Sequence, residues 1–409
     1  METEMQLLED LFEAYYEARR HKRNTLNQLH FEMDLEENIV RLYHEIKERR
    51  YEIGKSICFM VDHPVQREIF AADFRDRIIH HLLIGYINEF IERHLIYDCY
   101  SCRKGKGTHF GIKRLEHHIR SCSLNYTREC YILKLDLKGY FMNIEQKKLY
   151  TDILELLAKH MDEPMPDRTL WGDSYKYELV HYLLPIILFN DPTKNCHIKG
   201  TLADWEGLPL SKSLFHTPMG RGLPIGNLTS QLFSNVYLND FDHYVKRDLK
   251  MKHYGRYVDD FFFVHEDKEK LKELIPVIRQ WLWKNSGITI HPNKIYLQSY
   301  TKGVTFLGAV LKPHRNYVSN KVVYNFRRTL EECEQRLKNG EDSVDALKKM
   351  SSSINSYLGI LKHYKTYNIK KKLFFSRPLL LFQYGYLSND MGKFVLKKQL
   401  QVKNKEVED

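Results

Sequence analysis

Two adjacent aspartates, Asp259 and Asp260, are the residues best suited to metal-dependent chemistry. They follow Tyr257-Val258 and precede the apolar run Phe261–Val264. At about 4 Å and an effective dielectric constant near 20, like charges repel by roughly 4 kcal/mol, so an apolar setting opposes ionisation of both carboxylates. A divalent cation removes this repulsion, and Mg²⁺ prefers carboxylate oxygens. The alternative is an ordinary exposed turn, which aspartate also favours.

A third carboxylate, Asp136, lies near the end of the alternating segment Tyr131–Leu137, which predicts a strand with leucines on its buried face. By itself Asp136 could be a turn or capping residue. One strand-end aspartate and an aspartate pair in a hairpin are nevertheless what is needed to hold two Mg²⁺ ions about 3.5–4 Å apart. Such a pair of ions activates a 3′-hydroxyl and stabilises the leaving pyrophosphate in nucleotidyl transfer.

The elements that must position these aspartates are interleaved helices and strands. Apolar residues at helical spacing predict helices within residues 1–50, 76–87 and 268–284, and a largely helical segment over 146–215 with an irregular insertion at 190–213. Two short strands are expected within 253–264, separated by the aspartate pair. Beyond about Asn320 the chain is expected to be helical and basic to its end, with an interruption near Asn339-Gly340. The irregular order of helices and strands predicts an α+β fold.

Composition narrows the class of protein. The chain has 409 residues, of which 43% are hydrophobic and 13% aromatic, which is enough for a sizeable core and argues against disorder. No apolar run approaches the roughly 18 residues of a membrane span, so no membrane association is expected. The acidic N-terminus does not resemble a secretory signal. Seven cysteines without such a signal predict a reduced, cytoplasmic protein.

The net charge of +10 is concentrated at one end. Residues 301–409 contain 21 Lys and Arg against 10 Asp and Glu, so the rest of the chain is nearly neutral. This asymmetry indicates a polyanionic partner for the C-terminal region. A solvated basic helix surface is the alternative that charge alone leaves open.

Three motifs occur in order along the chain: Leu135-Asp136-Leu-Lys-Gly-Tyr-Phe141, Gly222-Leu-Pro-Ile-Gly-Asn-Leu-Thr-Ser-Gln231 and Tyr257-Val-Asp-Asp260. They are similar to the three core palm motifs of the reverse transcriptases. The resemblance extends upstream and downstream through Arg67–Arg77, Arg103–Thr108, His291–Lys294 and Phe306–Gly308.

This resemblance implies a right-hand polymerase architecture. Fingers are expected over residues 1–112, a ferredoxin-like palm over 113–310, and a basic helical thumb with a C-terminal tail over 311–409. The implied activity is RNA-directed DNA polymerisation with two Mg²⁺ ions, which Mn²⁺ could replace. An RNA template, a DNA or RNA primer and dNTPs are the expected partners, with a structured non-coding RNA or a small accessory protein as further possibilities.

Roles in the active site follow from the resemblance. Asp136, Asp259 and Asp260, with the backbone carbonyl of Leu137, are expected to ligate the metals, and Lys294 to protonate the pyrophosphate. The expected dNTP-binding residues are Arg67 at the triphosphate, Phe141 as the steric gate against a ribose 2′-hydroxyl, and Ile225 and Gly226 near the nascent base pair. Phe141 as core packing and Lys294 as an exposed loop residue are the alternatives.

Basic residues are the expected nucleic-acid contacts, because phosphate backbones are bound through charge. The alternatives are that Arg75 and Arg77 pair with Asp73 and Asp76, and that the 103–106 loop is free. The expected set is Arg75, Arg77, Arg103, Lys104, Lys106, Arg327, Arg328, Lys362, Lys370 and Lys371.

The central palm motif narrows the resemblance. Most reverse transcriptases have Gln where this chain has Ile225, and Ser-Pro where it has Ser230-Gln231. This version, with Asn355-Ser-Tyr-Leu-Gly359, is similar to bacterial reverse transcriptases of diversity-generating retroelements, which implies an error-prone enzyme. Related bacterial enzymes in antiphage defence remain an alternative. Two further rivals are an RNA-templated RNA polymerase, which Phe141 disfavours, and a catalytically silent relative, which the three aspartates disfavour.

Overall fold

The computed structural model describes residues 2–20, 25–62, 65–159 and 174–397. The chain divides into two compact units. The first contains Met1–Cys122 and Cys130–Leu297, and the second contains Ser123–Glu129 and Gln298–Asp409. No described helix combines the length and the apolar character that crossing a bilayer requires.

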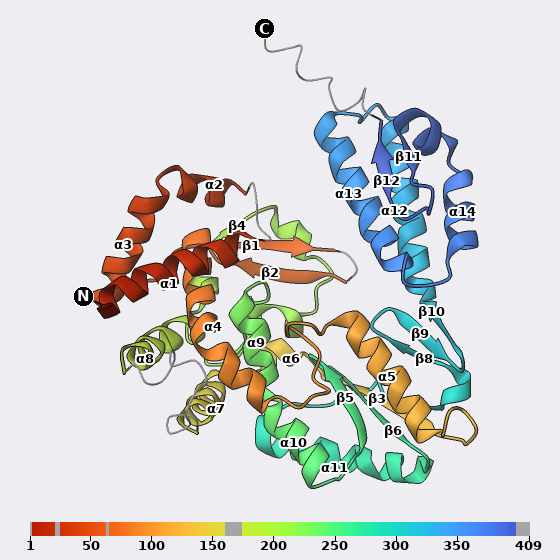
Figure 1. Ribbon diagram of the computed structural model, residues 1–409, viewed down its shortest axis with the longest axis horizontal. Helices are drawn as coiled ribbons and strands as arrows, with labels where there is room; N and C mark the ends of the chain where they lie inside the picture. Colours follow the sequence, from red (N-terminus) through yellow and green to blue (C-terminus); the bar gives the residue numbers. More distant parts are fainter. Residues whose placement is uncertain (1, 21–24, 63–64, 160–173, 398–409) are drawn as a thin grey trace. The chain divides into compact units, whose positions relative to one another are not determined.

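The first unit is mainly helical around two small sheets (Figure 1). Its helices are α1 (Glu2–Arg19), α2 (Leu26–Met33), α3 (Leu35–Lys47), α4 (Phe74–His94), α5 (Thr108–Cys122), α6 (Tyr140–Asn143), α7 (Gln146–Ala158), α8 (Ser174–Leu188), α9 (Leu228–Tyr237), α10 (Asn239–Arg247) and α11 (Lys268–Ser286). Short 3₁₀ turns η1 (Pro192–Lys194), η2 (Leu202–Trp205), η3 (Leu210–Lys212) and η4 (Leu214–His216) lie between α8 and α9.

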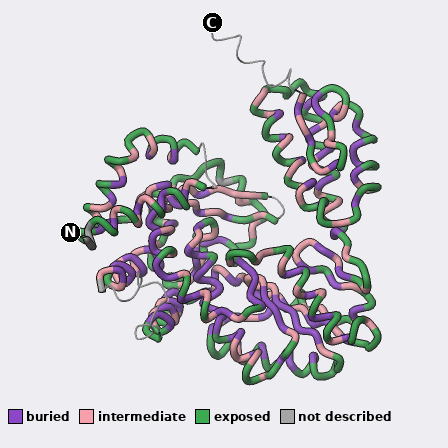
Figure 2. The backbone as a smooth tube through the Cα atoms, in the orientation of Figure 1, coloured by how far each residue is buried: buried purple, intermediate pink, exposed green. Residues whose placement is uncertain are grey.

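The larger sheet of this unit has the strand order β5-β6-β3-β7. Its strands are β3 (Tyr131–Asp136), β5 (His253–Tyr257), β6 (Asp260–His265) and β7 (Tyr296–Ser299). Helix α5 packs against β5 and β6, and α11 packs against β6 and β3. Figure 2 shows β6 buried along most of its length, which explains its continuous apolar run Phe261–Val264. β3 is buried at Ile132, Leu133 and Leu135.

The smaller sheet has the order β2-β1-β4, with β1 (Ser56–Val61), β2 (Arg67–Ala71) and β4 (Cys196–Ile198). β1 and β2 are antiparallel neighbours in the chain. β4 comes from the segment between α8 and α9 and joins β1 in parallel. The predicted irregular insertion at 190–213 therefore contributes a strand to this sheet.

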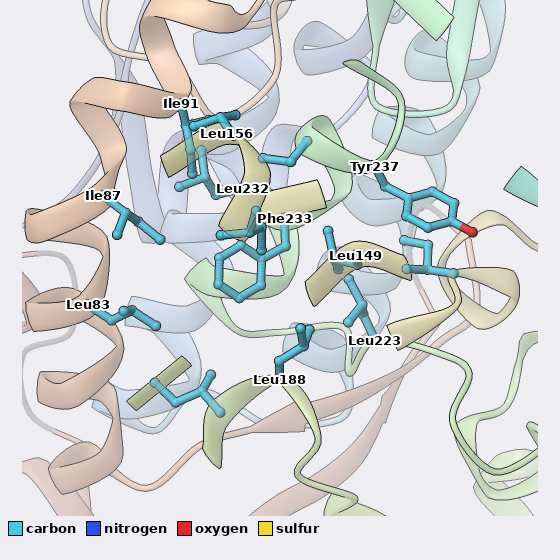
Figure 3. Close-up of a cluster of buried hydrophobic side chains, with 14 of the residues drawn as sticks. Leu83, Ile87, Ile91, Leu149, Leu156, Leu188, Leu223, Leu232, Phe233 and Tyr237 are labelled. Carbon is cyan, nitrogen blue, oxygen red and sulfur yellow. The ribbon is translucent and has the colours of Figure 1, made fainter. Parts of the chain in front are cut away.

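A shared apolar core fixes the helices of the first unit. Figure 3 shows Leu83, Ile87 and Ile91 of α4 facing the side chains of α7 and α9, including Leu149, Leu156, Leu232 and Phe233. The members from α4 recur every four residues, which places them on one face of the helix. Leu223, from the loop before α9, is buried in the same core. The loop that contains Ile225 is thereby held in place.

The second unit has its own core. It contains α12 (Asn320–Lys338), α13 (Val344–Leu361), α14 (Tyr367–Phe375), η5 (Tyr300–Lys302), a π-helical turn η6 (Leu379–Tyr384), a sheet of β8 (Val304–Phe306), β9 (Ala309–Lys312) and β10 (Arg315–Val318), and the hairpin β11 (Gly385–Leu387)–β12 (Phe394–Leu396). The expectation of helix from Asn320 to the end is therefore wrong at this hairpin. The Asn355 amide exchanges two hydrogen bonds with the Phe394 backbone, which fixes β12 on α13.

Candidate active site

The antiparallel pairing of β3 with β6 brings the aspartates together. In this register Asp136 lies directly opposite Asp260. The hairpin is present as predicted, but Val258 and Asp259 form its two-residue turn and Asp260 begins β6, one residue earlier than the expected Asp259-Asp260 turn. Val258 has φ +55°, an unusual conformation for a β-branched residue, so the turn needs support from its surroundings.

Burial and repulsion from neighbouring aspartates oppose ionisation of Asp259 and Asp260. Burial, followed by the neighbouring Asp136 and Asp260, raises the pKa of Asp259 to about 6. Burial also raises the pKa of Asp260, although Lys134 opposes the shift. Like charges held close together favour retention of a proton or recruitment of a cation.

Two lysines contact the aspartates. Lys294 Nζ lies 2.9 Å and 3.0 Å from the two carboxylate oxygens of Asp136, and Lys134 Nζ lies 3.4 Å from Asp260 Oδ1. Lys294 is exposed in the loop before β7, as the alternative has it, and it also contacts the carboxylate cluster. Its expected role towards pyrophosphate stays a prediction.

The carboxylates of Asp136, Asp259 and Asp260 are oxygen donors that could hold a hard divalent cation. Within the described parts of the chain, no group of three His, Cys, Asp or Glu side chains is already gathered as a metal site. Asp136 and Asp260 instead face lysines, while Asp259 carries a raised pKa that the other two aspartates help to cause. Oxygen ligands with unfavourable mutual charge fit a hard divalent cation. The backbone of Leu137, the other expected ligand, bridges to Ile290.

A fully buried ion pair supports the turn between β5 and β6. Arg256 on β5 and Asp242 on α10 both have side chains with 0% exposure, and the guanidinium binds the carboxylate through contacts of 2.6–3.1 Å. Tyr254 donates a further hydrogen bond to Asp242 at 2.6 Å. A buried charge persists at low cost only when it is paired in this way.

The same network reaches the strained residue of the turn. Arg256 Nη1 donates to the Val258 carbonyl at 3.0 Å and to Asn235 Oδ1 at 3.3 Å. Ser101 Oγ accepts from Val258 N at 3.3 Å and donates to Asn235 Oδ1. Sequence reasoning missed these residues. The sequence offers one indication of this network, which is that a charged residue, Arg256, lies within a segment predicted to be a buried strand.

The predicted gate residue, Phe141, lies on α6 immediately after the strand that carries Asp136. Gly139 has φ +55° and turns the chain from β3 into this short helix. The Phe141 ring is half-buried and packs against an apolar cluster of Cys58, Phe70, Met142 and Leu214. Its backbone carbonyl accepts from Leu223 N at 3.0 Å, so Phe141 and the Ile225 loop are joined.

Gly226 has a packing role that the sequence did not reveal. Phe70 N on β2 donates to the Ile225 carbonyl at 2.8 Å. A Cβ atom on Gly226 would lie 2.8 Å from the Phe70 carbonyl oxygen and 2.9 Å from an Ile69 side-chain carbon. The glycine therefore permits this loop to approach β2, which is a physical requirement besides the expected one at the base pair. Ile225 packs against the same cluster as Phe141.

Several of the expected nucleic-acid contacts in the first unit have internal partners. Arg75 pairs with Glu45 and Asp76, and Arg77 is half-buried near Asp73. Arg103 has only 6% of its side chain exposed and binds Glu92 at 2.7 Å. These partners favour a structural role for the three arginines. For Arg75 and Arg77 this agrees with the alternative that they pair with nearby acidic residues.

The two lysines of the loop after Arg103 differ in their exposure. Lys106 donates to the Tyr97 carbonyl at 2.6 Å and lies over the Tyr97 ring. Lys104 is exposed.

The second unit exposes most of its expected cations. Arg327, Lys362 and Lys371 are exposed, and Arg328 is exposed while paired with Glu332 at 2.8 Å. Lys370 differs, because it is 7% exposed and donates to the carbonyls of Met391 and Asp390 at 2.9 Å and 3.3 Å. The expectation that Lys370 binds nucleic acid is corrected, since its ammonium group holds the β11–β12 turn.

Comparison with known proteins places the chain in a family. Residues 66–311 match the family model described as Reverse transcriptase (RNA-dependent DNA polymerase). Telomerase from Candida albicans, solved in complex with a telomeric RNA fragment, is similar with a TM-score of 0.45 and 12% identity over 80% of this chain and 56% of that one. Apo telomerase from Candida tropicalis gives a TM-score of 0.47 and 12% identity over 80% and 59%. This chain thus spans less than two thirds of the length of those structures.

No curated protein sequence matches significantly. The family match covers more than half of the chain and contains Asp136, Asp259 and Asp260. Together with the mixed helices and sheets it confirms the expected α+β fold of right-hand polymerase type. This chain belongs to the reverse transcriptase family, whose members are described as RNA-dependent DNA polymerases.

Proposed function

We propose that this protein synthesises DNA on an RNA template, using dNTPs and a DNA or RNA primer. One observation carries the proposal. The β3–β6 register places Asp136 opposite Asp260 and leaves Asp259 in the adjoining turn. The family match over residues 66–311 supports the same reaction.

Asp136, Asp259 and Asp260 would hold two Mg²⁺ ions, and Mn²⁺ could take their place, with the Leu137 carbonyl as a further ligand. Bound there, the ions supply Lewis-acid activation of the 3′-hydroxyl and charge stabilisation of the leaving pyrophosphate. Lys294 keeps its ammonium group beside Asp136 at 2.9 Å, where it can hold a proton close to the developing pyrophosphate charge.

The positions of Phe141 and Arg67 support selection of dNTPs. Phe141 follows the Asp136 strand directly, so its ring can crowd the ribose 2′-position of a bound nucleotide. Arg67 is exposed at the start of β2, where a planar guanidinium suits a triphosphate. The exposed cations Arg327, Lys362 and Lys371 would follow the phosphate backbone of the template–primer duplex.

The finer proposal is that synthesis is error-prone, as in a diversity-generating retroelement. Ile225 supports it, because an aliphatic side chain packed in an apolar cluster offers no hydrogen bond to monitor base pairing. A structured non-coding RNA or a small accessory protein would be the expected partner in that setting.

Primer extension on an RNA template tests the proposed reaction directly. The full chain should incorporate dNTPs only with Mg²⁺ or Mn²⁺, and EDTA should stop the reaction. Incorporation of rNTPs in preference to dNTPs would indicate an RNA polymerase. A wild-type protein that binds template–primer but extends nothing would favour the catalytically silent alternative.

A further inference from the structure

Residues 195–216, which lie between α8 and α9, bond to the strands β1 and β2 of the small sheet. We call them the bridging segment. Its strand β4 pairs in parallel with β1, with Cys196 opposite Ser56 and Ile198 opposite Cys58. The 3₁₀ turns η2 to η4 follow β4 in the chain, and residues of this stretch bond to Gln66 and Glu68 at the start of β2. This segment therefore contacts more than one strand of the sheet that carries Arg67.

The carboxylate of Glu68 on β2 joins the small sheet to the bridging segment. Glu68 is 1% exposed, and its carboxylate accepts three hydrogen bonds: from Trp205 Nε1 at 2.7 Å, from Ser213 Oγ at 2.8 Å and from Leu214 N at 2.6 Å. All three donors belong to the bridging segment. A buried carboxylate is stable when donors surround it in this way, and bonds to the charged form are strong.

Arg67 lies between two residues, Gln66 and Glu68, that are both hydrogen-bonded to the bridging segment. Residues on a strand alternate between its faces, so Glu68 points inward while Arg67 is exposed on the other side. Gln66, which precedes Arg67 in the chain, donates to the carbonyls of Asp204 and Glu206 at 3.0 Å and 3.1 Å. The backbone of Arg67 is thus held by the bridging segment before and after it.

The other end of the segment touches the element that carries the gate. A Cβ atom on Gly139, which precedes α6, would lie 3.1 Å from the Ser211 carbonyl oxygen. Leu214 belongs to the apolar cluster against which Phe141 and Ile225 pack. One continuous segment therefore joins the strand of Arg67 to the residues around Phe141.

We propose that the bridging segment sets the nucleotide selectivity of this enzyme, with Glu68 as the positioning residue that fixes Arg67 relative to Phe141. The inference rests on the proposed polymerase function and adds a determinant of dNTP binding to it. Loss of the Glu68 contacts frees β2 to shift, so the triphosphate is gripped less well and the 2′-position is crowded less strictly.

The test is steady-state dNTP and rNTP incorporation by the full chain carrying Glu68→Gln, with Trp205→Phe as a milder variant. The amide retains the size of the carboxylate but cannot accept from all three donors, and the Phe ring removes one donor. We expect KM for dNTP to rise roughly 5- to 20-fold for Glu68→Gln with a smaller change in kcat. The dNTP-over-rNTP ratio of kcat/KM should fall, and Trp205→Phe should show the same pattern more weakly.

Asp10→Asn is a matched control for the loss of a well-bonded carboxylate. Asp10 on α1 accepts from Tyr86 Oη at 2.7 Å and from Gln6 at 3.0 Å, away from both β2 and α6. It should lower the melting temperature without changing KM or the dNTP-over-rNTP ratio. If Glu68→Gln and Trp205→Phe behave like this control beside an active wild type, Glu68 is merely structural and the inference is overturned. An inactive wild type would instead overturn the polymerase assignment, and the inference with it.

Discussion

The β5–β6 hairpin and the second unit differ in whether their charged residues are buried or exposed. Around the β5–β6 turn, Arg256 and Asp242 are fully buried and paired, and they hold the backbone beside Asp259. In the second unit, Lys362 and Lys371 are exposed. Buried charges fix geometry, whereas exposed charges add a field that salt screens. We therefore expect hairpin variants to fail in the chemical step and variants of the exposed lysines to change only binding.

The largest effect should come from Asp259→Asn. The change removes a metal-binding charge while keeping the volume, so primer extension should fall on the order of 100- to 1,000-fold or more. Asp136→Asn should act in the same way. Glu266→Gln, an exposed acid just after β6, is the control and should leave extension unchanged. Near wild-type extension by Asp259→Asn would remove the metal assignment.

The same variant should be more stable than the wild type in EDTA. Folding raises the pKa of Asp259 from about 3.9 to about 6, so between these values the folded state binds more protons than the unfolded state. This carboxyl group therefore lowers stability as pH rises from about 4 to 6. Asp259→Asn should gain about 3 kcal/mol at pH 7.5, and the gain should disappear below pH 4 in urea titrations. A constant difference across pH would contradict this.

Breaking the buried ion pair should be the next largest effect. Asp242→Asn leaves Arg256 without its charged partner, which typically costs about 3–5 kcal/mol of stability. The double variant Arg256→Met/Asp242→Leu should recover much of that stability, because apolar residues can replace a buried pair. It should remain poorly active, since the Val258 carbonyl no longer has the Arg256 donor. A stable and fully active double variant would show that the pair contributes stability alone.

Phe141→Ala should open the space that the ring denies to a ribose 2′-hydroxyl. The ratio of kcat/KM for dNTP over rNTP should fall roughly 10-fold or more. Leu149→Ala on α7 is a control for lost core packing, because Leu149 is buried in the main core. It should lower stability and leave the ratio unchanged. An unaltered ratio for Phe141→Ala would make this ring simply part of the core.

Sequence reasoning predicted the catalytic strands well because their signals are local. Alternating leucines placed Asp136 at a strand end, and Asp259-Asp260 between two apolar runs placed them in a hairpin. The supporting network could not be predicted in this way. Asp242, Asn235 and Arg256 meet only after α9, α10 and β5 have packed together.

Basic residues were predicted less well, because charge in a sequence does not reveal the partner. Arg103 and Lys370 both belong to lysine- and arginine-rich stretches, yet one binds Glu92 and the other binds backbone carbonyls inside its unit. Their exposed neighbours Lys104 and Lys371 have the same local composition. Only the folded chain separates the two groups.

Ile225→Gln should improve fidelity by a modest factor. A side-chain amide can donate and accept near the incoming nucleotide, and one hydrogen bond of roughly 0.5–1.5 kcal/mol corresponds to about a 2- to 13-fold change in discrimination. We expect fewer errors, above all opposite template adenines, when cDNA made on an RNA template is sequenced. Ile225→Leu, which keeps the apolar contact, is the control. An accurate wild type, or an unchanged error spectrum, would favour the antiphage alternative.

The smallest effects should come from two adjacent lysines on α14, and they test the comparison most directly. Lys371 is exposed, so Lys371→Gln should reduce the slope of log K against log salt for template–primer binding by roughly 0.7–0.9 if it contacts one phosphate. Over a threefold rise in salt this amounts to about a twofold difference in affinity. Lys370 is buried against the Met391 and Asp390 carbonyls, so Lys370→Gln should leave the slope unchanged and lower the melting temperature. Both variants remove one positive charge from the same helix, so net charge cannot explain a difference between them. Equal slopes for the two variants, measured by fluorescence anisotropy from 50 to about 200 mM salt, would place the phosphate contact elsewhere.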